Sequence, residues 1–157
     1  MSDEKKLSEE KILNEEKQFC TFSLDGHCFG VNVLEVQEVF RYQEMTAVPL
    51  APETITGLIN LRGQIITAID LRRFMKLNER DEEEMPMNIV VRTSEDVVSL
   101  LVDEIGDVQN VPQNLYEPPP ENLHGPLRDL VKGVYKLQDK LLLILDTEKV
   151  VGEPATA

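Results

Sequence analysis

The feature that most constrains the fold of this 157-residue chain is an internal repeat. A glycine, three apolar residues and an aspartate recur at a spacing of 76 residues. The matched positions are Gly57, Leu61, Ile65, Ile69 and Asp70 in the first copy, and Gly133, Leu137, Leu141, Leu145 and Asp146 in the second. Upstream, residues 33–39 (VLEVQEV) resemble residues 102–108 (VDEIGDV) at a spacing of 69. The chain is therefore predicted to be a duplicated unit.

Each copy of the repeat carries the sequence pattern of short strands. Residues 19–33 (FCTFSLDGHCFGVNV) alternate across an Asp-Gly pair, which is typical of a β-hairpin. Residues 57–74 (GLINLRGQIITAIDLRRF) predict a second hairpin with Arg62-Gly63 at its tip, and Asp70 can cap a short helix after it. The second copy repeats the pattern, with a turn at 94–96 and a hairpin over 131–145 that leads into a helix. The unit thus has about five short strands.

A small sheet controls its edges best by closing into a barrel, and neither copy is large enough for a substantial core of its own. We therefore predict an all-β fold of two packed five-stranded barrels with short helices. The predicted divisions are a flexible N-terminal segment (1–17), a first barrel (18–84) and a second barrel with a short C-terminal helix (85–157). For residues 1–17, a short helix is the alternative prediction to disorder. The acidic stretch NERDEEEMP (78–86) is predicted to be a solvated linker.

Charge and hydropathy exclude two classes of partner. The formal net charge is −13 and the pI is near 4.5, which argues against nucleic acid and against an anionic membrane surface. The longest strictly apolar run, 141–145, is far shorter than the roughly 20 residues of a membrane helix. The first 17 residues lack the apolar core of a signal peptide, so a cytoplasmic location is expected.

Candidate catalytic and metal-ligating residues are sparse. A two-residue turn at 25–26 places Cys20 opposite Val31 and not opposite Cys28, so both thiols are predicted to be free. Neither His27 nor His124 has a Cys or His partner at ligand spacing, and no metal or cofactor is predicted. No phosphate-binding loop or nucleophile motif is present in the sequence.

An enzyme and a small-ligand-binding barrel are the rival classes. Acidic pairs such as Glu35 with Glu38, or Asp103 with Asp107, would act as general acid and base only inside a pocket. A ligand-binding barrel needs a larger interior than five short strands provide. We therefore expect no catalytic activity.

The tip of the first long hairpin is the main functional candidate. The repeat aligns Arg62-Gly63 with Gln138-Asp139, so the turn itself does not require a cation. Gly63 is predicted to supply a positive φ. Both faces of the hairpin are partly apolar, so the sister barrel or a partner should cover one of them. A guanidinium beside such a surface can hold a partner carboxylate or amide through two hydrogen bonds.

Four segments, VLEVQEV, GLINLRGQIITAIDLR, VVSLLVDEIGDV and LLLILDTEKV, resemble the CheW-like family of chemotaxis coupling proteins over residues 18–151. The resemblance implies two Src-homology-3-like barrels. It also implies a non-catalytic adaptor in the cytoplasm, recruited to receptor arrays at the inner face of the membrane. The implied partners are the cytoplasmic tip of a chemoreceptor, which is a helical hairpin, and the regulatory domain of the histidine kinase CheA.

The resemblance also implies two sets of contact residues. Its receptor groove lies between the barrels and includes the N-L-R-G tip, which implicates Gly57, Asn60, Arg62 and Gly63, with Val33, Val36 and Glu38 lining the same region. The kinase contact is expected at Met87, Ile105 and Val108. For Ile105 and Val108, a role in the core is the competing interpretation.

Overall fold

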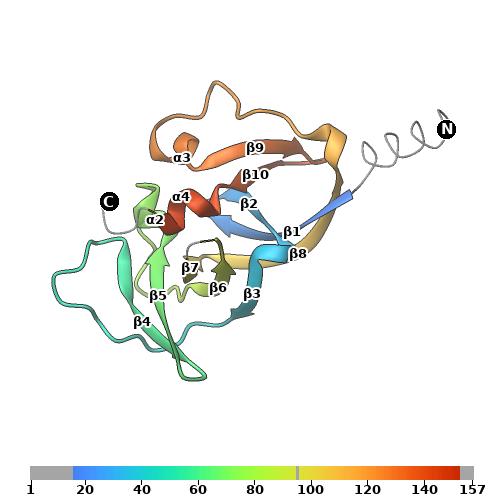
Figure 1. The fold of residues 1–157 in the computed structure, drawn as a ribbon. Helices are drawn as coiled ribbons and strands as arrows, with labels where there is room; N and C mark the ends of the chain where they lie inside the picture. Colours follow the sequence, from blue (N-terminus) through green and yellow to red (C-terminus); the bar gives the residue numbers. More distant parts are fainter. Residues whose placement is uncertain (1–15, 95, 153–157) are drawn as a thin grey trace.

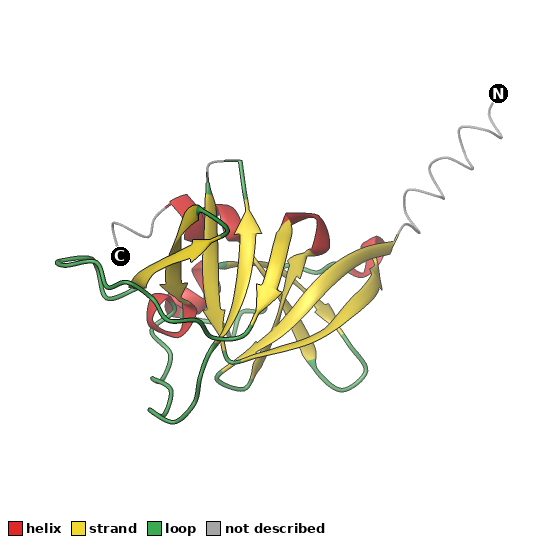
Figure 2. Ribbon diagram, turned by 90° about the horizontal axis from the view of Figure 1, so that it is seen from below, coloured by secondary structure: helices red, strands yellow, loops and turns green. Residues whose placement is uncertain are grey.

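The computed structural model describes residues 16–94 and 96–152 as two five-stranded sheets with short helices (Figure 1). Sheet A has the strand order β8-β1-β2-β10-β9 and sheet B the order β3-β6-β7-β5-β4. The strands are β1 (Glu16–Leu24), β2 (His27–Asn32), β3 (Val36–Phe40), β4 (Ile55–Leu61), β5 (Gln64–Asp70), β6 (Met87–Arg92), β7 (Val97–Val102), β8 (Glu104–Pro112), β9 (Val131–Lys136) and β10 (Leu141–Leu145). The helices are η1 (Val33–Glu35), α2 (Leu71–Phe74), η2 (Gln113–Leu115), α3 (Gly125–Asp129) and α4 (Thr147–Gly152). Figure 2 shows that these helices are short segments among the strands.

Each sheet combines strands from both copies of the repeat. The hairpin β1–β2 leaves its own copy and joins β8, β9 and β10, while β6–β7 joins β3, β4 and β5. The predicted boundary at residues 84 and 85 separates the two copies, but it does not separate the two sheets. The exchange produces two parallel pairs, β2 with β10 and β5 with β7. Parallel neighbours need a long crossover. The chain between β2 and β10 passes through sheet B, whereas the chain between β5 and β7 passes through α2 and β6 of the same sheet.

The N-terminal boundary also differs from the prediction. Strand β1 begins at Glu16, so the last two residues of the segment predicted to be flexible belong to sheet A, where they pair with the end of β8. Residues 1–15 lie outside the described residues, and the prediction for them stays a prediction.

The strand registers confirm the repeat. Leu58 faces Thr67 in the β4–β5 hairpin, and the residues 76 positions later, Val134 and Leu143, face each other in β9–β10. Both hairpins contain a register shift at the same place, which leaves Thr56 and Lys132 as the extra residues. The 69-residue spacing also holds, because Val36 faces Val91 and its counterpart Ile105 faces Phe22.

The predicted closure into barrels is only partial. After the edge strand β3, Thr46 forms a bridge to Leu58 of the opposite edge strand β4. After β8, Glu117 forms the equivalent bridge to Val134 of β9. These contacts curl each sheet, but within the described residues each closing contact is a single bridge and not a continuous strand pairing.

The main hydrophobic core lies between the sheets and draws on both. Phe22 and Phe29 of sheet A stack with ring centroids 5.5 Å apart, and they belong to one cluster with Ile69 and Leu100 of sheet B. The opposite face of each sheet carries smaller clusters. These are Phe19, Val111, Tyr135, Leu142 and Ile144 in sheet A, and Ile59, Ala68, Leu101, Leu61, Ile66 and Val90 in sheet B. The two cysteines are free, as predicted.

An ion-pair network also joins the sheets at the junction of β7 and β8. The Asp103 carboxylate accepts hydrogen bonds from Arg72 Nε at 2.8 Å, from Arg80 Nε at 2.9 Å and from the Asp25 N–H at 2.8 Å. Arg80 also contacts Asp70. The predicted solvated linker is therefore wrong at Arg80, whose side chain is only 9% exposed. Burial alone would raise the pKa of Asp103, but the hydrogen bonds from Arg72 and from the backbone hold this pKa below its usual value.

Candidate functional site

The β4–β5 hairpin projects from the body of the molecule and ends in a two-residue turn (Figure 1). Arg62 and Gly63 both have positive φ, 53° and 87°, which defines the mirror-image turn that matches the twist of a hairpin. The prediction of a positive φ for Gly63 is confirmed. The Gly63 N–H donates to Asn60 Oδ1 at 2.9 Å, so Asn60 fixes the turn that presents Arg62.

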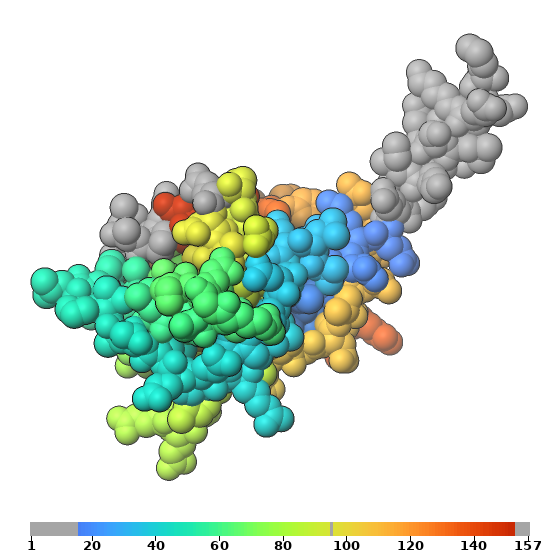
Figure 3. Space-filling view, turned by 60° about the horizontal axis from the view of Figure 1, so that its bottom comes forward, coloured from blue at the N-terminus to red at the C-terminus, as the bar shows by residue number. Residues whose placement is uncertain are grey.

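The cation at this tip is paired with the opposite edge of the same sheet. The two terminal nitrogens of Arg62 donate to the two carboxylate oxygens of Glu38, at 2.8 and 2.7 Å. The hydrogen bonds to Glu38 and its charge raise the pKa of Arg62. Glu38 lies in β3, and Figure 3 shows the β4–β5 hairpin and β3 side by side on one face. The pair therefore holds the projecting tip against β3.

The pair is open to solvent and has exposed apolar neighbours. The Arg62 side chain is 74% exposed and that of Glu38 is 25% exposed. Ile65, which faces Asn60 across the hairpin, is 61% exposed, and Val39 next to Glu38 is also exposed. We call Glu38, Val39, Asn60, Arg62, Gly63 and Ile65 the tip surface. An exposed ion pair contributes little to folding. The exposure of the Arg62 side chain leaves its guanidinium accessible to a partner.

The other residues assigned to the receptor lie elsewhere. Val36 is half-buried at the start of β3 and packs against the main core, and Val33 lies before it in η1. Gly57 lies beside the closing bridge between Thr46 and Leu58, and a Cβ there would lie 2.7 Å from the Thr46 carbonyl oxygen. The structure thus brings four of the seven residues to the tip surface.

A groove of about 1010 Å³ is lined by residues of both sheets. Met87 and Ile105, which were assigned to the kinase, line it beside Phe22 and Met85, with Arg72 and Asp103 of the ion network among the polar groups. Both predicted residues also pack against the main core. Val108 lies farther along β8, does not line the groove and is 51% exposed. None of the seven residues assigned to the receptor lines this groove, and their assignment stays a prediction.

Three of the four acidic residues considered for catalysis are engaged in other side-chain contacts. Glu35 accepts a hydrogen bond from Thr147 Oγ1 at 2.8 Å, Glu38 is bound to Arg62, and Asp103 is held by two arginines. Among the described residues, no group of three His, Cys, Asp or Glu side chains is arranged to hold a metal ion. None of the helices described is long and apolar enough to cross a membrane.

Two curled five-stranded sheets, each built like a Src-homology-3 unit, define a small β-sheet protein with a projecting tip and a separate groove. The family model for the CheW-like domain matches residues 18–155, and the chain belongs to this family.

Two relatives and one solved structure are similar to this chain over most of its length. It is 29% identical to the chemotaxis protein CheW of Klebsiella aerogenes over 141 residues, covering 90% of this chain and 85% of that protein. It is 28% identical to CheW of Bacillus subtilis over 140 residues, covering 89% and 90%. The crystal structure of the scaffolding protein TtCheW from Thermoanaerobacter tengcongensis matches with a TM-score of 0.76 and 32% identity, covering 83% of this chain and 88% of that one.

Proposed function

We propose that the protein is a non-catalytic adaptor that couples the cytoplasmic tips of chemoreceptors to the histidine kinase CheA. It would work in the cytoplasm, at receptor arrays on the inner face of the membrane, and would need no cofactor. Family membership over residues 18–155 and the likeness to a scaffolding protein support this function. The observation that carries it is the separation of two surfaces, the tip surface and the groove, because an adaptor must hold two partners at once.

We assign the receptor to the tip surface. The Arg62 guanidinium has five N–H donors, of which Glu38 takes two, so further donors remain for a carboxylate or carbonyl of a partner. Exposed Ile65 and Val39 supply apolar contact beside this charge. Such a mixture of a charged anchor and apolar area suits the exposed end of an amphipathic helical hairpin.

We assign the kinase regulatory domain to Met87, Ile105 and Val108. The second candidate is the reverse assignment, with the receptor in the groove and the kinase at the tip surface, and the apolar lining of the groove favours it. A helix with its side chains is about 10 Å across, and apolar grooves commonly receive one apolar face of such a helix. The lining by Met85, Met87 and Ile105 fits that mode.

Two separate titrations test the adaptor and decide between the assignments. Arg62→Ala and Val108→Asp each change an exposed side chain, so both variants should stay folded. We expect Arg62→Ala to weaken binding of a receptor tip fragment and to leave binding of the kinase regulatory domain unchanged, with the opposite pattern for Val108→Asp. Arg128→Ala, on α3, is the matched arginine control. A mirrored pattern establishes the reverse assignment, and wild-type protein that binds neither partner contradicts the adaptor function.

A further inference from the structure

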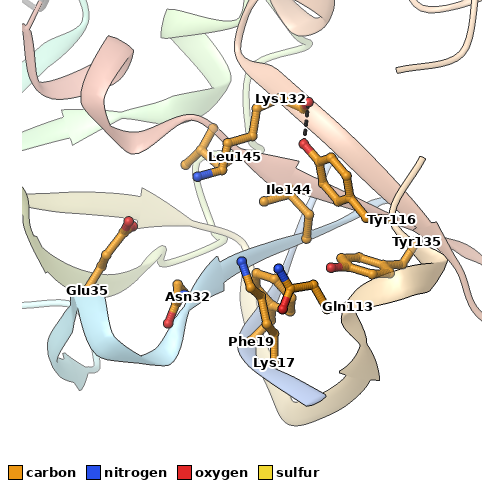
Figure 4. A pocket seen from close by; sticks show the side chains of 10 residues that line it. All are labelled: Lys17, Phe19, Asn32, Glu35, Gln113, Tyr116, Lys132, Tyr135, Ile144 and Leu145. Carbon is orange, nitrogen blue, oxygen red and sulfur yellow. Dashed lines mark hydrogen bonds between the residues drawn. The ribbon is translucent and has the colours of Figure 1, made fainter. Parts of the chain in front are cut away.

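A second cavity opens on sheet A, away from the surfaces assigned above. It has a volume of about 370 Å³, within the range of small-molecule sites, and Figure 4 shows side chains from several elements around it. Its aromatic members are Phe19, Tyr116 and Tyr135. The remaining lining residues are Lys17, Asn32, Glu35, Gln113, Lys132, Ile144 and Leu145.

The repeat shows that the fold does not require this cavity. At the equivalent place in sheet B, Ile59, Ala68 and Leu101 form a buried apolar cluster, and Met45 packs against it. Their counterparts in sheet A, taken from the strand registers, are Tyr135, Ile144, Asn32 and Tyr116. Sheet A therefore has an amide and two phenols where sheet B has aliphatic side chains.

Tyr116 is held at the wall of the cavity. Its ring lies over Gly133, where a Cβ would collide with the ring, and its hydroxyl donates to the Lys132 carbonyl oxygen. Tyr116 and Tyr135 meet edge to face with centroids 5.5 Å apart, and Tyr135 also contacts Phe19 at 5.6 Å. These contacts give the cavity an ordered aromatic wall.

Tyr135 supplies an unused hydrogen-bond donor. The residue is only 2% exposed, and its hydroxyl makes no hydrogen bond to the described residues. No buried polar side-chain atom of the described residues lacks a partner, so this hydroxyl must open into the cavity. Figure 4 shows it pointing toward Gln113. Burial and the neighbouring Tyr116 raise the pKa of Tyr135, so the hydroxyl stays protonated at neutral pH.

The charges around the cavity favour an anion in spite of the chain's net charge of −13. Lys17 and Lys132 line it, and neither ammonium forms an ion pair with a described residue. The single carboxylate in the lining, Glu35, already accepts the hydrogen bond from Thr147. Two lysines and a phenol donor thus line the cavity together with its aromatic wall.

We propose that this cavity binds a small aromatic carboxylate. The ring of the ligand packs on the exposed ring of Tyr116, and its carboxylate accepts hydrogen bonds from the Tyr135 hydroxyl and from the lysines at the rim. This site is independent of the adaptor function, since none of its lining residues is assigned to the receptor or to the kinase.

The test uses the full chain and two probes, phenylacetate and its neutral analogue phenylacetamide. Binding of each probe is measured by the change in backbone amide chemical shifts in NMR. Phenylacetate has about ten heavy atoms, so the protein should bind it with a Kd in the millimolar range, about 1 to 10 mM. We expect saturable shifts centred on Tyr135, Ile144 and Lys132, and weaker binding of the amide. Equal affinity for both probes, or no saturable shift at the cavity, overturns the proposal.

Two variants sharpen this test. Lys132→Met removes one ammonium and should weaken phenylacetate binding by up to about fivefold, the range of an exposed ion pair. Tyr135→Phe keeps the ring packing and removes the donor, and it should weaken binding by a similar factor. Lys76→Met, an exposed lysine after α2, is the matched control and should bind as the wild type does. A loss of binding in Lys76→Met equal to that in Lys132→Met contradicts a localised site.

Discussion

The two long hairpins of the repeat share one backbone plan and differ at their tips. The β4–β5 and β9–β10 hairpins have the same register and the same bulge. The first turn uses positive φ at Arg62 and Gly63, whereas Gln138 and Asp139 are not among the described residues with positive φ. Register is thus common to both hairpins, while the turn chemistry is particular to one.

The contact made by the first tip is also missing from the second copy. Glu38 and Arg62 correspond by the repeat to Asp107 and Gln138. The first two form a bidentate pair, but the described residues include no hydrogen bond between the side chains of the second two. Because the second hairpin reaches the same register without such a pair, the register does not require the pair. This asymmetry is the physical basis for assigning a partner to the first tip.

A second asymmetry lies where each copy passes from one sheet to the other. Asp103 stands between β7 and β8 and is held by Arg72 and Arg80, whereas its counterpart Leu34 lies between β2 and β3 and is 90% exposed. One crossing is therefore fixed by ionic contacts. The other leaves an apolar side chain in solvent.

The largest expected effect comes from breaking the ionic crossing. Asp103→Asn removes the charge that two arginines share, and breaking such a pair should lower the free energy of unfolding by about 2 to 4 kcal/mol. Leu34→Ala, at the equivalent crossing, should change it by less than about 0.5 kcal/mol. Urea unfolding at neutral pH measures both. An equal loss of unfolding free energy in the two variants would contradict the difference between the two crossings.

The pH dependence checks the same prediction. The folded pKa of Asp103 is depressed, so its stabilising contribution is complete above the ordinary value of about 3.9 and is lost as pH falls through the folded pKa. The difference in stability between wild type and Asp103→Asn should therefore shrink below about pH 4. A constant difference down to pH 2 would mean that the carboxylate is not the stabilising group.

The next largest effect is the cost of adding a Cβ beside each closing bridge, and its cause differs between the two copies. A Cβ at Gly57 would lie 2.7 Å from the Thr46 carbonyl oxygen, whereas one at Gly133 would meet the ring of Tyr116. Each Gly→Ala change should cost about 1 to 3 kcal/mol in the free energy of unfolding. The obstacle is backbone in one copy and a side chain in the other, so only the second should be relieved by shortening that side chain.

Double-variant cycles test this difference. Tyr116→Ala should recover most of the cost of Gly133→Ala, while Met45→Ala, at the matching position, should recover little of the cost of Gly57→Ala. Thermal and urea unfolding of the single and double variants give the coupling energies. Equal recovery in both copies would show that the two bridges are packed alike.

The repeat made much of the fold predictable from the sequence. Matching positions such as Gly57 and Gly133 carry enough local pattern to give strands, hairpins and registers. The exchange of hairpins between the sheets was missed, because hydrophobic alternation specifies a buried face and not which distant strand lies beside it. The parallel pairing of β2 with β10 joins segments more than 100 residues apart, which no local pattern encodes.

The ion pairs between charged side chains were also not predicted from the sequence. The sequence singled out both Glu38 and Arg62, but it gave no sign that they touch, since they lie on opposite edges of the sheet order. Arg80 sits in a run of acidic residues, and that composition hid its burial against Asp103. One usable signal was present in the repeat. Asn32 and Tyr135 replace Leu101 and Ile59 at core positions, and this marks the cavity in sheet A.

The smallest effect on stability, and the most informative for function, comes from exchanging the two tips. Arg62→Gln gives the first turn the residue of the second, and Gln138→Arg does the reverse. Neither should move the thermal midpoint, because both side chains lie at hairpin turns and an exposed ion pair adds little to folding. Arg62→Gln should weaken binding of a receptor tip fragment by about tenfold if the guanidinium makes a charge-assisted contact. Gln138→Arg should not restore it, since that turn lies on sheet A, far along the chain from Glu38. Restored binding in the double variant would show that any projecting cation suffices, and a lowered midpoint in Arg62→Gln would show that the pair stabilises the fold.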